Sequence, residues 1–485
     1  MLAIQKNLTN TFYAILSLPA TAMGFALSVQ IAAMSWILTT QYGLDIHDVG
    51  FVWAAGPIAG ILGQVIIGIV SDNVWFWGGR RRPFILIGGV LASLSLLALP
   101  NIDVISATMG FDGVLGVAIT VALVLDLSIN VSFNPTRSVI ADVTPEGVER
   151  TKGYTWMQTV SGSFGVLAYA IGTYLNNFTL IYFGAVLVLV FSVIPCFFIK
   201  EPESISASHE FADMEKQSFS LMDGLMIIKP LWGFLIYGIY ALVARLADIK
   251  FDHYYIEAGC LVITLFFVGR TLLTEEDESK QAHQEHLGFQ KVLAAHSFTW
   301  VGVQSMFIYM VAFVQFNQPD LSNDENGSVV NTSFLILSAI AAILPVLVLQ
   351  PLTRKIGSVK THAYCILSMA VGYFVLSQVG SVSGLVYLCM ALLGVGWSAT
   401  ISLPFAIMSQ KVEQSKMGLY MGLFNLSVVL PQLVASLGVG MAVSSAENKN
   451  VLFLICGSCL LISAICWLRI KEEKIEANEA ASSTH

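Results

Sequence analysis

The chain has 485 residues, of which 56% are hydrophobic and only 12% are charged. Soluble domains carry roughly 25% charged residues, so this composition excludes a water-soluble globular protein. The net charge of −8, with no face rich in basic residues, gives no sign of nucleic-acid binding.

Apolar stretches long enough to cross a membrane follow one another along most of the chain. A helix needs about 20 apolar residues to span a hydrocarbon core of ~30 Å. The first six predicted spans are 11–40, 47–71, 83–101, 114–141, 153–176 and 179–199. The second six are 293–316, 331–352, 361–379, 382–409, 417–442 and 450–468. Six spans followed by six more are typical of a large class of transporters.

The segment between these two sets is unusually apolar. A polar stretch, 201–217, precedes two apolar runs at 231–246 and 257–273, and a hydrophilic linker follows at 274–290. We expect the two runs to form an extra transmembrane hairpin, which makes about fourteen spans. The alternative is a re-entrant or interfacial pair, because the first run is short and contains Arg245.

These spans divide the chain into four parts. The expected parts are an N-terminal six-helix bundle, a middle region with the hairpin at about 231–273, a C-terminal six-helix bundle and a tail. Their boundaries are 1–200, 201–291, 292–470 and 471–485. Lys and Arg concentrate in the loops on one side, and such loops face the cytoplasm. We therefore expect a multi-pass protein of the inner or plasma membrane with both termini cytoplasmic.

The two sets of six spans repeat short motifs in the same order. Gly68-Ile-Val-Ser-Asp72 and Gly79-Arg-Arg-Arg-Pro83 follow the second span, and Pro351-Leu-Thr-Arg-Lys-Ile-Gly357 follows its counterpart. Asn134-Pro-Thr-Arg137 and Ser402-Leu-Pro-Phe405 mark matching exits of the fourth and tenth spans. Because the halves have the same orientation, the axis that relates them is expected to lie along the membrane normal.

Asp126 is a carboxylate in the middle of the fourth predicted span. Arg137, near the cytoplasmic end, lies 11 residues further on, about 16 Å along a helix that rises ~1.5 Å per residue. Helical periodicity places Asp126 and Asn130 on the same face as Arg137. A carboxylate at this depth marks a functional site or a buried partner. Desolvation favours its protonated form, so Asp126 is predicted to carry a proton; a purely structural hydrogen bond or ion pair is the alternative.

The motifs resemble those of a known family. The Gly-x-x-Ser-Asp and Gly-Arg-Arg-Arg-Pro-Phe signals between spans 2 and 3 resemble the cytoplasmic loop motif of the major facilitator superfamily. The three arginines and the Leu125-to-Asp142 segment are similar to the branch of plant sucrose–proton symporters and bacterial maltose/sucrose (glycoside-pentoside-hexuronide) transporters. Phe298-Thr-Trp-Val-Gly302 resembles the seventh helix of that branch. In helix 1 this chain has Gln30-Ile-Ala-Ala33 where the relatives carry Gln-Asn-x-Asn.

The resemblance implies an all-α membrane protein with the major facilitator fold and a parallel pseudo-twofold repeat. It also implies that Asp126 couples transport to protons. The tenth-helix equivalent, Val395, is apolar, so coupling would reside in one half. One charge moved through 100 mV is worth about 2.3 kcal/mol, which supports a concentration ratio of nearly fiftyfold. One proton per sugar is therefore enough.

Amide and aromatic side chains within the spans suit an uncharged ligand rich in hydroxyl groups, because amides both donate and accept hydrogen bonds. The predicted substrate-binding group is Gln30, Asn130, Gln158, Trp300, Gln304 and Trp397. The alternative is that these side chains hold neighbouring helices together.

A second group of charged residues lies at the cytoplasmic ends of the spans. Following the resemblance, we expect a cytoplasmic gate made by Asp72, Arg80, Arg81, Arg82, Arg137 and Asp142. The alternative is that the arginines only set topology.

The sequence thus predicts a monomeric, proton-coupled symporter of a disaccharide such as maltose or sucrose. It is not expected to be an enzyme, and no cofactor or metal is predicted beyond the coupling proton. The seven cysteines lie in apolar stretches, so neither a disulfide framework nor a zinc site is expected. Two alternatives remain: a facilitator or antiporter for another small solute, and a membrane sensor that transports nothing.

Overall fold

The computed structural model describes residues 3–60, 74–145, 148–201, 221–247, 249, 253–274, 281–412 and 417–472. Within these ranges the chain is helical, and the one β-type contact is an isolated bridge between Phe76 and Gly79. Ten helices in the described ranges are long and apolar enough to cross a membrane. The structure is therefore that of an all-helical, multi-pass membrane protein. The expected total of about fourteen spans stays a prediction.

The first half consists of long helices with short connecting segments. Its elements are α1 (Ala3–Lys6), α2 (Asn10–Val29), η1 (Gln30–Met34), α3 (Ser35–Thr40), α4 (Ile46–Trp53), α6 (Arg82–Ala98), η2 (Leu99–Asn101), α7 (Ile102–Met109), α8 (Leu115–Val143), α9 (Val148–Tyr174) and α10 (Asn177–Phe198). The segments α2, η1 and α3 form one continuous span over 10–40.

The rest of the chain continues in the same way. The middle elements are α12 (Leu221–Ile227), η3 (Lys229–Leu231), α13 (Trp232–Leu246) and α14 (Tyr255–Leu273). The second half has α15 (Gln281–Asn317), α16 (Asn323–Leu344), η4 (Pro345–Leu349), α17 (Gln350–Ile356), α18 (Ser358–Val379), α19 (Ser383–Ser402), α20 (Pro404–Ser409), α21 (Met417–Leu433), η6 (Val434–Val439), α22 (Gly440–Ser445) and α23 (Val451–Trp467).

Polar residues just before the apolar runs fix where several helices begin. The first backbone N–H groups of a helix have no partner within the helix, so a side-chain oxygen that accepts from them is stabilising. Thr9 accepts from the backbone of Phe12 before α2, and Asn176 does the same for α10. Ser322 and Glu325 form a reciprocal capping box at α16.

Two prolines that occupy matching places in the repeat have different effects. Pro135 lies inside α8, which continues as one helix to Val143. In the second half α19 ends at Ser402, and Pro404 begins the separate helix α20. A proline ring removes one helical hydrogen bond and crowds the preceding turn, and the two halves accommodate this differently. The motif match did not predict that difference.

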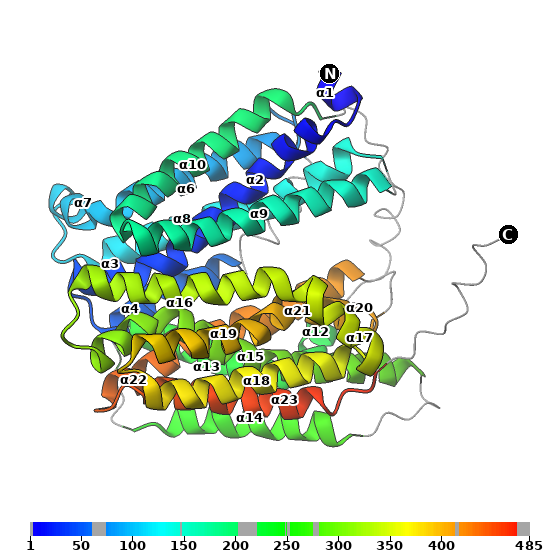
Figure 1. Cartoon of the computed structure of the whole chain (residues 1–485). Coiled ribbons are helices and arrows are strands. Elements are labelled where there is room, and N and C mark those ends of the chain that lie inside the picture. Colours follow the sequence, from blue (N-terminus) through cyan, green and yellow to red (C-terminus); the bar gives the residue numbers. More distant parts are fainter. Residues whose placement is uncertain are drawn as a thin grey trace.

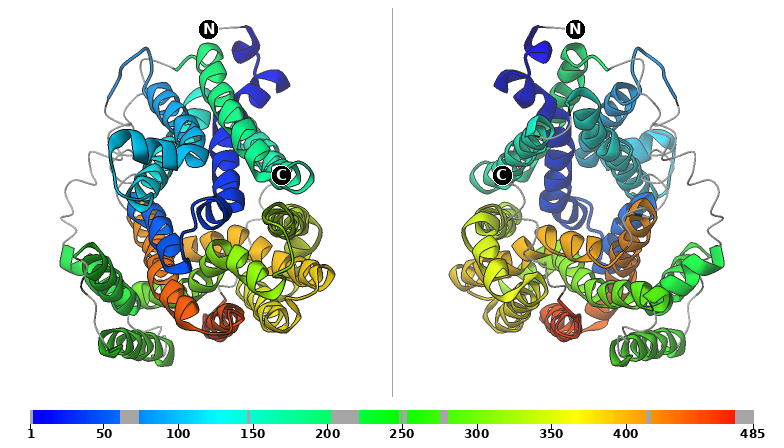
Figure 2. Two further views of the ribbon diagram at one scale, coloured as in Figure 1. Left: turned by 90° about the vertical axis from the view of Figure 1, so that its left-hand side faces the viewer. Right: turned by 90° about the vertical axis from the view of Figure 1, so that its right-hand side faces the viewer.

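The helices form two groups that face each other (Figure 1). In Figure 1, α2, α6, α8, α9 and α10 lie above, and the helices from α15 to α23 lie below. Seen from either end, the hairpin of α13 and α14 lies at the periphery of the second group (Figure 2).

The two groups are hydrogen-bonded to each other at the start of α3, at the α9–α10 junction and at the start of α16. Trp36 donates to the carbonyl of Asn323 over 2.7 Å, Asn331 donates to Asn177 over 2.7 Å, and Ser328 donates to the carbonyl of Thr173 over 3.2 Å. This end of the molecule lies opposite the start of α2 and the end of α23 (Figure 1). It is called the bonded end below.

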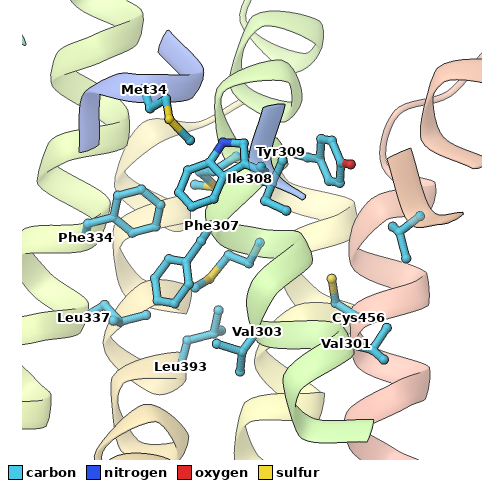
Figure 3. Close-up of a cluster of buried hydrophobic side chains, with 14 of the residues drawn as sticks. Met34, Val301, Val303, Phe307, Ile308, Tyr309, Phe334, Leu337, Leu393 and Cys456 are labelled. Atoms are coloured by element: carbon cyan, nitrogen blue, oxygen red, sulfur yellow. The ribbon is translucent and has the colours of Figure 1, made fainter. Parts of the chain in front are cut away.

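Apolar packing continues from the bonded end towards the middle of the molecule. Met34 of η1 belongs to the same buried cluster as Phe307, Phe334 and Leu337 of the second half (Figure 3). On α4, a Cβ at Gly50 would collide with the carbonyl of Ser436 and the hydroxyl of Tyr309, so only glycine allows this close approach. The halves therefore touch through backbone as well as side chains.

The hairpin contacts both groups. A Cβ at Gly233 would collide with Thr264 and the carbonyl of Cys260, which shows how closely α13 and α14 pack. Tyr237 of α13 packs with Leu433 and Leu437 of the second half. Arg245, at the end of α13, forms an ion pair with Asp48 on α4 of the first half.

Candidate transport site

Asp126 lies in the middle of α8 and forms a hydrogen bond with helix 1. Its side chain is 7% exposed, and the Nε2 group of Gln30 donates to its Oδ2 over 3.0 Å. Gln30 is 1% exposed and is the first residue of the π-helical segment η1. Single π-turns within α-helices are frequent at functional sites. Two residues predicted separately from the sequence are thus direct partners.

The partner of this carboxylate is neutral. Across the described part of the chain, no basic side chain forms an ion pair with Asp126. Within the same part, the buried Oε1 atom of Gln30 has no donor. Asn130, one turn along α8, donates to the backbone carbonyl of Asp126 over 2.8 Å. Gly56 of the second span faces this carboxylate, and a Cβ there would lie 3.4 Å from Oδ2, an ordinary contact distance.

The predicted site residues of the second half include two aromatic side chains and no carboxylate. Trp300 of α15 lies edge-on to Trp397 of α19 with ring centroids 6.1 Å apart, and Phe307 packs edge-on to the same Trp397 at 5.4 Å. The indole N–H of Trp300 donates to the buried His296 over 2.8 Å. This bond holds the Trp300 ring in a defined orientation.

The remaining predicted amides lie in different surroundings. Gln432 of α21 donates to Gln304 of α15 over 3.1 Å, so Gln304 is joined to another amide. Gln158 is exposed on α9. Where the relatives carry further amides on helix 1, Ile31 is half-buried and Ala33 is fully buried in the core. The predicted residues therefore lie in both halves, as the Asp126–Gln30 pair in the first and the Trp300–Trp397 and Gln304–Gln432 pairs in the second. Their binding role stays a prediction.

The charged residues at the other end form a network within the first half. Arg80 and Arg81 contact Asp142 at the end of α8 over 3.1 and 3.2 Å. Arg82 reaches the carbonyl of Gly78 over 3.4 Å. Arg137 lies over the ring of Phe133 at 4.9 Å. Asp72 lies outside the described residues. The described ion pairs join α6 to α8, and their gating role stays a prediction.

Glu201 is the central acceptor of this network, and sequence reasoning missed it. Its carboxylate accepts from the backbone N–H groups of Arg80, Arg81 and Arg82 over 2.7, 2.9 and 2.8 Å. The positive end of a helix dipole favours a carboxylate there. Glu201 thereby fastens the end of α10 to the start of α6.

Glu472 makes the corresponding contact in the second half. It accepts from the backbone of Ser358 over 2.6 Å and of Val359 over 3.0 Å, which fastens the end of α23 to the start of α18. Both acids end the same tripeptide, Ile199-Lys200-Glu201 and Ile470-Lys471-Glu472. This repeat is the signal in the sequence that could have identified them.

Comparison with known families identifies the fold. A family model described as Major Facilitator Superfamily matches residues 16–436. The chain belongs to the major facilitator superfamily. The match covers both predicted halves and confirms the resemblance seen in the motifs. Because the family and the matched relatives are transporters, the prediction of a membrane transporter instead of an enzyme is confirmed.

Two relatives match this chain over most of their own length. A sucrose transport protein of Arabidopsis thaliana is 23% identical over 422 residues, covering 80% of this chain and 76% of the relative. A sucrose transport protein of Oryza sativa subsp. indica is 26% identical over 484 residues, covering 86% of this chain and 85% of the relative. A general alpha-glucoside permease of Schizosaccharomyces pombe is 34% identical over 136 residues, 27% of this chain and 24% of the permease. These matches confirm the resemblance to the sucrose/maltose branch.

Solved structures share the fold at low sequence identity. A POT family peptide transporter superimposes with a TM-score of 0.66 at 12% identity, covering 95% of this chain and 98% of that chain. A nucleoside transporter superimposes with a TM-score of 0.62 at 11% identity, covering 95% of this chain and 100% of that chain. At this identity the likeness establishes the fold alone.

Proposed function

We propose that this chain is a proton-coupled symporter of a disaccharide, an α-glucoside such as sucrose or maltose. The observation that carries the proposal is Asp126, a buried carboxylate in the middle of α8 whose side-chain partner is an amide. A cation beside an acid favours the ionised form. A neutral partner leaves both the ionised and the protonated form of the carboxyl group accessible, and a proton carrier requires both.

The Gln30 amide can bond Asp126 in either protonation state. Its N–H groups can donate to the ionised carboxylate, and in this structure Nε2 lies 3.0 Å from Oδ2. After a rotation of the amide, its carbonyl oxygen accepts from the protonated acid. The unpartnered Oε1 atom is equally suited to accept from a sugar hydroxyl. Protonation of Asp126 and sugar binding would therefore both involve the Gln30 amide.

The second half offers the apolar surface that a sugar ring needs. The faces of Trp300 and Trp397 suit the C–H face of a pyranose, and the Gln304–Gln432 pair suits its hydroxyl groups. The names of the relatives support this class of substrate, since they are sucrose transport proteins and an alpha-glucoside permease.

Transport would proceed by alternating access between the halves. We place both termini in the cytoplasm of a cell with this protein in its plasma membrane, so the bonded end would face outward. Sugar uptake would then require the hydrogen bonds of Trp36 and Asn331 to break and re-form in each cycle. The hairpin of α13 and α14 would complete fourteen spans, and the functional unit would be a monomer.

Uptake into proteoliposomes with an imposed pH gradient tests this function. Labelled sucrose and maltose are compared with a nucleoside, a dipeptide and a polyol, each with and without a protonophore. We expect protonophore-sensitive accumulation of at least one disaccharide and no accumulation of the other solutes. Accumulation of a non-sugar alone would overturn the sugar assignment, and disaccharide uptake that a protonophore leaves unchanged would favour a facilitator.

A matched pair of acid-to-amide substitutions tests the coupling residue. Asp126→Asn is compared with Asp103→Asn, which changes an exposed acid on α7. Accumulation should be lost in the first variant and retained in the second. Accumulation in Asp126→Asn equal to that of the unmodified protein would refute the assigned role.

A further inference from the structure

A cavity of about 570 Å³ lies between the hairpin and the second half. One wall is formed by α13 and α14, and the other by α15, η6, α22 and α23. Representative wall residues are Phe234, Cys260, Phe298, Val439, Ala442 and Cys459. Cavities of roughly 300–1,000 Å³ are the size that binds small ligands. This cavity contains none of the residues of the candidate transport site.

The lining changes from polar to apolar along the direction of the helices. Glu257, Tyr254 and Ser445 lie near the start of α14 and the end of α22, at the bonded end of the molecule. Phe298 and Val301 lie near the middle of the span His286–Asn317. The cavity thus runs from the edge of the hydrocarbon layer towards its centre, the arrangement that a lipid head group and chain require.

The hairpin separates this cavity from the bilayer by a single layer of helices. On the other face of α14, Val262 is 65% exposed and Phe266 is 59% exposed. Side chains of this type, on a helix that qualifies as a span, face lipid. Bilayer lipid is therefore the molecule on the outer face of α14, one helix away from the cavity.

The polar end of the cavity contains an incompletely bonded carboxylate. Tyr240 donates to Oε1 of Glu257 over 3.0 Å. The other oxygen, Oε2, is buried and has no donor among the described residues. The buried hydroxyl of Tyr237 likewise has no hydrogen-bond partner among those residues. Within those residues no basic side chain pairs with Glu257. Buried polar groups in proteins nearly always have partners, so these atoms indicate a ligand with a donor.

We propose that this cavity binds a membrane phospholipid whose head group carries a primary ammonium. The ammonium lies against Glu257, and one acyl chain extends between α14 and α15 towards Phe298. A charged N–H donor compensates a carboxylate better than a neutral hydroxyl does. An anionic head group would be repelled, and a trimethylammonium group has no N–H to donate. The proposal is independent of the transported solute.

Native mass spectrometry of the purified full-length chain tests this site. The protein is offered phosphatidylethanolamine, phosphatidylcholine and phosphatidylglycerol with identical acyl chains, and a sterol in a fourth arm. A charge-assisted hydrogen bond predicts retention of phosphatidylethanolamine about tenfold above the other lipids. Glu257→Gln should remove that preference while chain binding persists. Equal retention of all four lipids by the unmodified protein, or preference for the sterol, would overturn the proposal.

Two further variants separate filling the cavity from disturbing the helix surface. Ala442→Phe introduces a ring into the cavity and should abolish retention of every lipid. Val262→Phe introduces the same ring on the opposite, exposed face of α14 and should change nothing. Ser445→Phe blocks the polar end and serves as a second variant if Ala442→Phe does not fold. Equal losses from Val262→Phe and the cavity variants would contradict the assigned location.

Discussion

The two halves share a scaffold and differ in the chemistry that they bring to the centre. In the first half a buried carboxylate, Asp126, is bonded to the amide of Gln30. In the second half the indoles of Trp300 and Trp397 meet edge-on, and Gln304 is bonded to Gln432. The position equivalent to Asp126 is Val395, which packs in an apolar cluster. On the proposed function, the first half would carry the proton and the second half would bind the sugar ring.

The shared scaffold is clearest at the ends of the helices. Glu201 accepts from three backbone N–H groups before α6, and Glu472 accepts from the backbone before α18. Each acid follows the last helix of its half and caps the third. The capping contact is therefore the same in both halves, while the polar residues at the centre are not.

The largest effect is expected from removing the single buried acid. Asp126→Asn should lower the accumulation ratio at 100 mV from nearly fiftyfold to about one, because no proton then moves with the sugar. Exchange of labelled for unlabelled sugar should continue, since the fold and the Gln30 contact are compatible with an amide. Flux measurements in proteoliposomes check both outcomes.

Adding an acid to the second half tests whether the two halves are interchangeable. In the double variant Asp126→Asn with Val395→Asp, the new carboxylate lies among Leu349, Cys365 and Ala399, with no amide comparable to Gln30 in that cluster. Coupling should not return. Restored accumulation would mean that the halves are interchangeable and that the surroundings of Asp126 are unimportant.

Trp300→Ala should weaken sugar binding without uncoupling transport. An aromatic side chain buried against a ligand contributes about 1.5–3 kcal/mol, which corresponds to a KM higher by about 10- to 100-fold. The KM of Trp300→Phe should lie between those of the unmodified protein and Trp300→Ala. Trp232→Ala on α13 serves as the control outside the predicted site. An unchanged KM in Trp300→Ala would exclude this residue from the sugar site.

The capping acids should affect stability, with the first half more sensitive. Glu201 is 3% exposed and accepts three backbone bonds, whereas Glu472 is half-buried and caps two residues. A hydrogen bond to a charged group contributes about 1.5–3 kcal/mol. Glu201→Gln should therefore lower the Tm more than Glu472→Gln, as thermal-shift assays can measure. The opposite order would contradict the geometry.

The smallest effect is expected from the ion pair between the hairpin and the first half. Both side chains are partly exposed, and such pairs contribute roughly 0–1 kcal/mol. Arg245→Gln should ease separation of the halves at the bonded end and change the transport rate by less than about fivefold. Arg270→Gln, at the exposed opposite end of α14, should leave the rate unchanged. Equal effects of both substitutions would indicate that the Asp48 contact has no specific role.

Much of this architecture could be predicted from the sequence because membrane helices are encoded locally. The runs of apolar residues predicted α6, α8, α10 and α18 to within a few residues. The depth of Asp126 followed from the helical rise, and its burial was confirmed. Its pairing with Gln30 could not be predicted, because it depends on how α2 and η1 pack against α8.

The features missed from the sequence are two contacts between segments that are distant in the chain and one difference between matching prolines. Glu201 was grouped with a polar stretch, although its partners lie about 120 residues earlier. Pro135 and Pro404 occupy matching motifs, yet only the second separates two helices. The close approach at Gly50 depends on Ser436. Tertiary packing decides the contacts of Glu201 and Gly50, and a local pattern does not encode them.

Proton coupling is proposed to reside in one half of the molecule, at Asp126. Its most direct test is the simultaneous measurement of sugar uptake and internal pH in proteoliposomes containing the unmodified protein or Asp126→Asn. The account predicts one proton per sugar in the unmodified protein and sugar movement without protons in the variant. Proton movement with sugar in Asp126→Asn would contradict it.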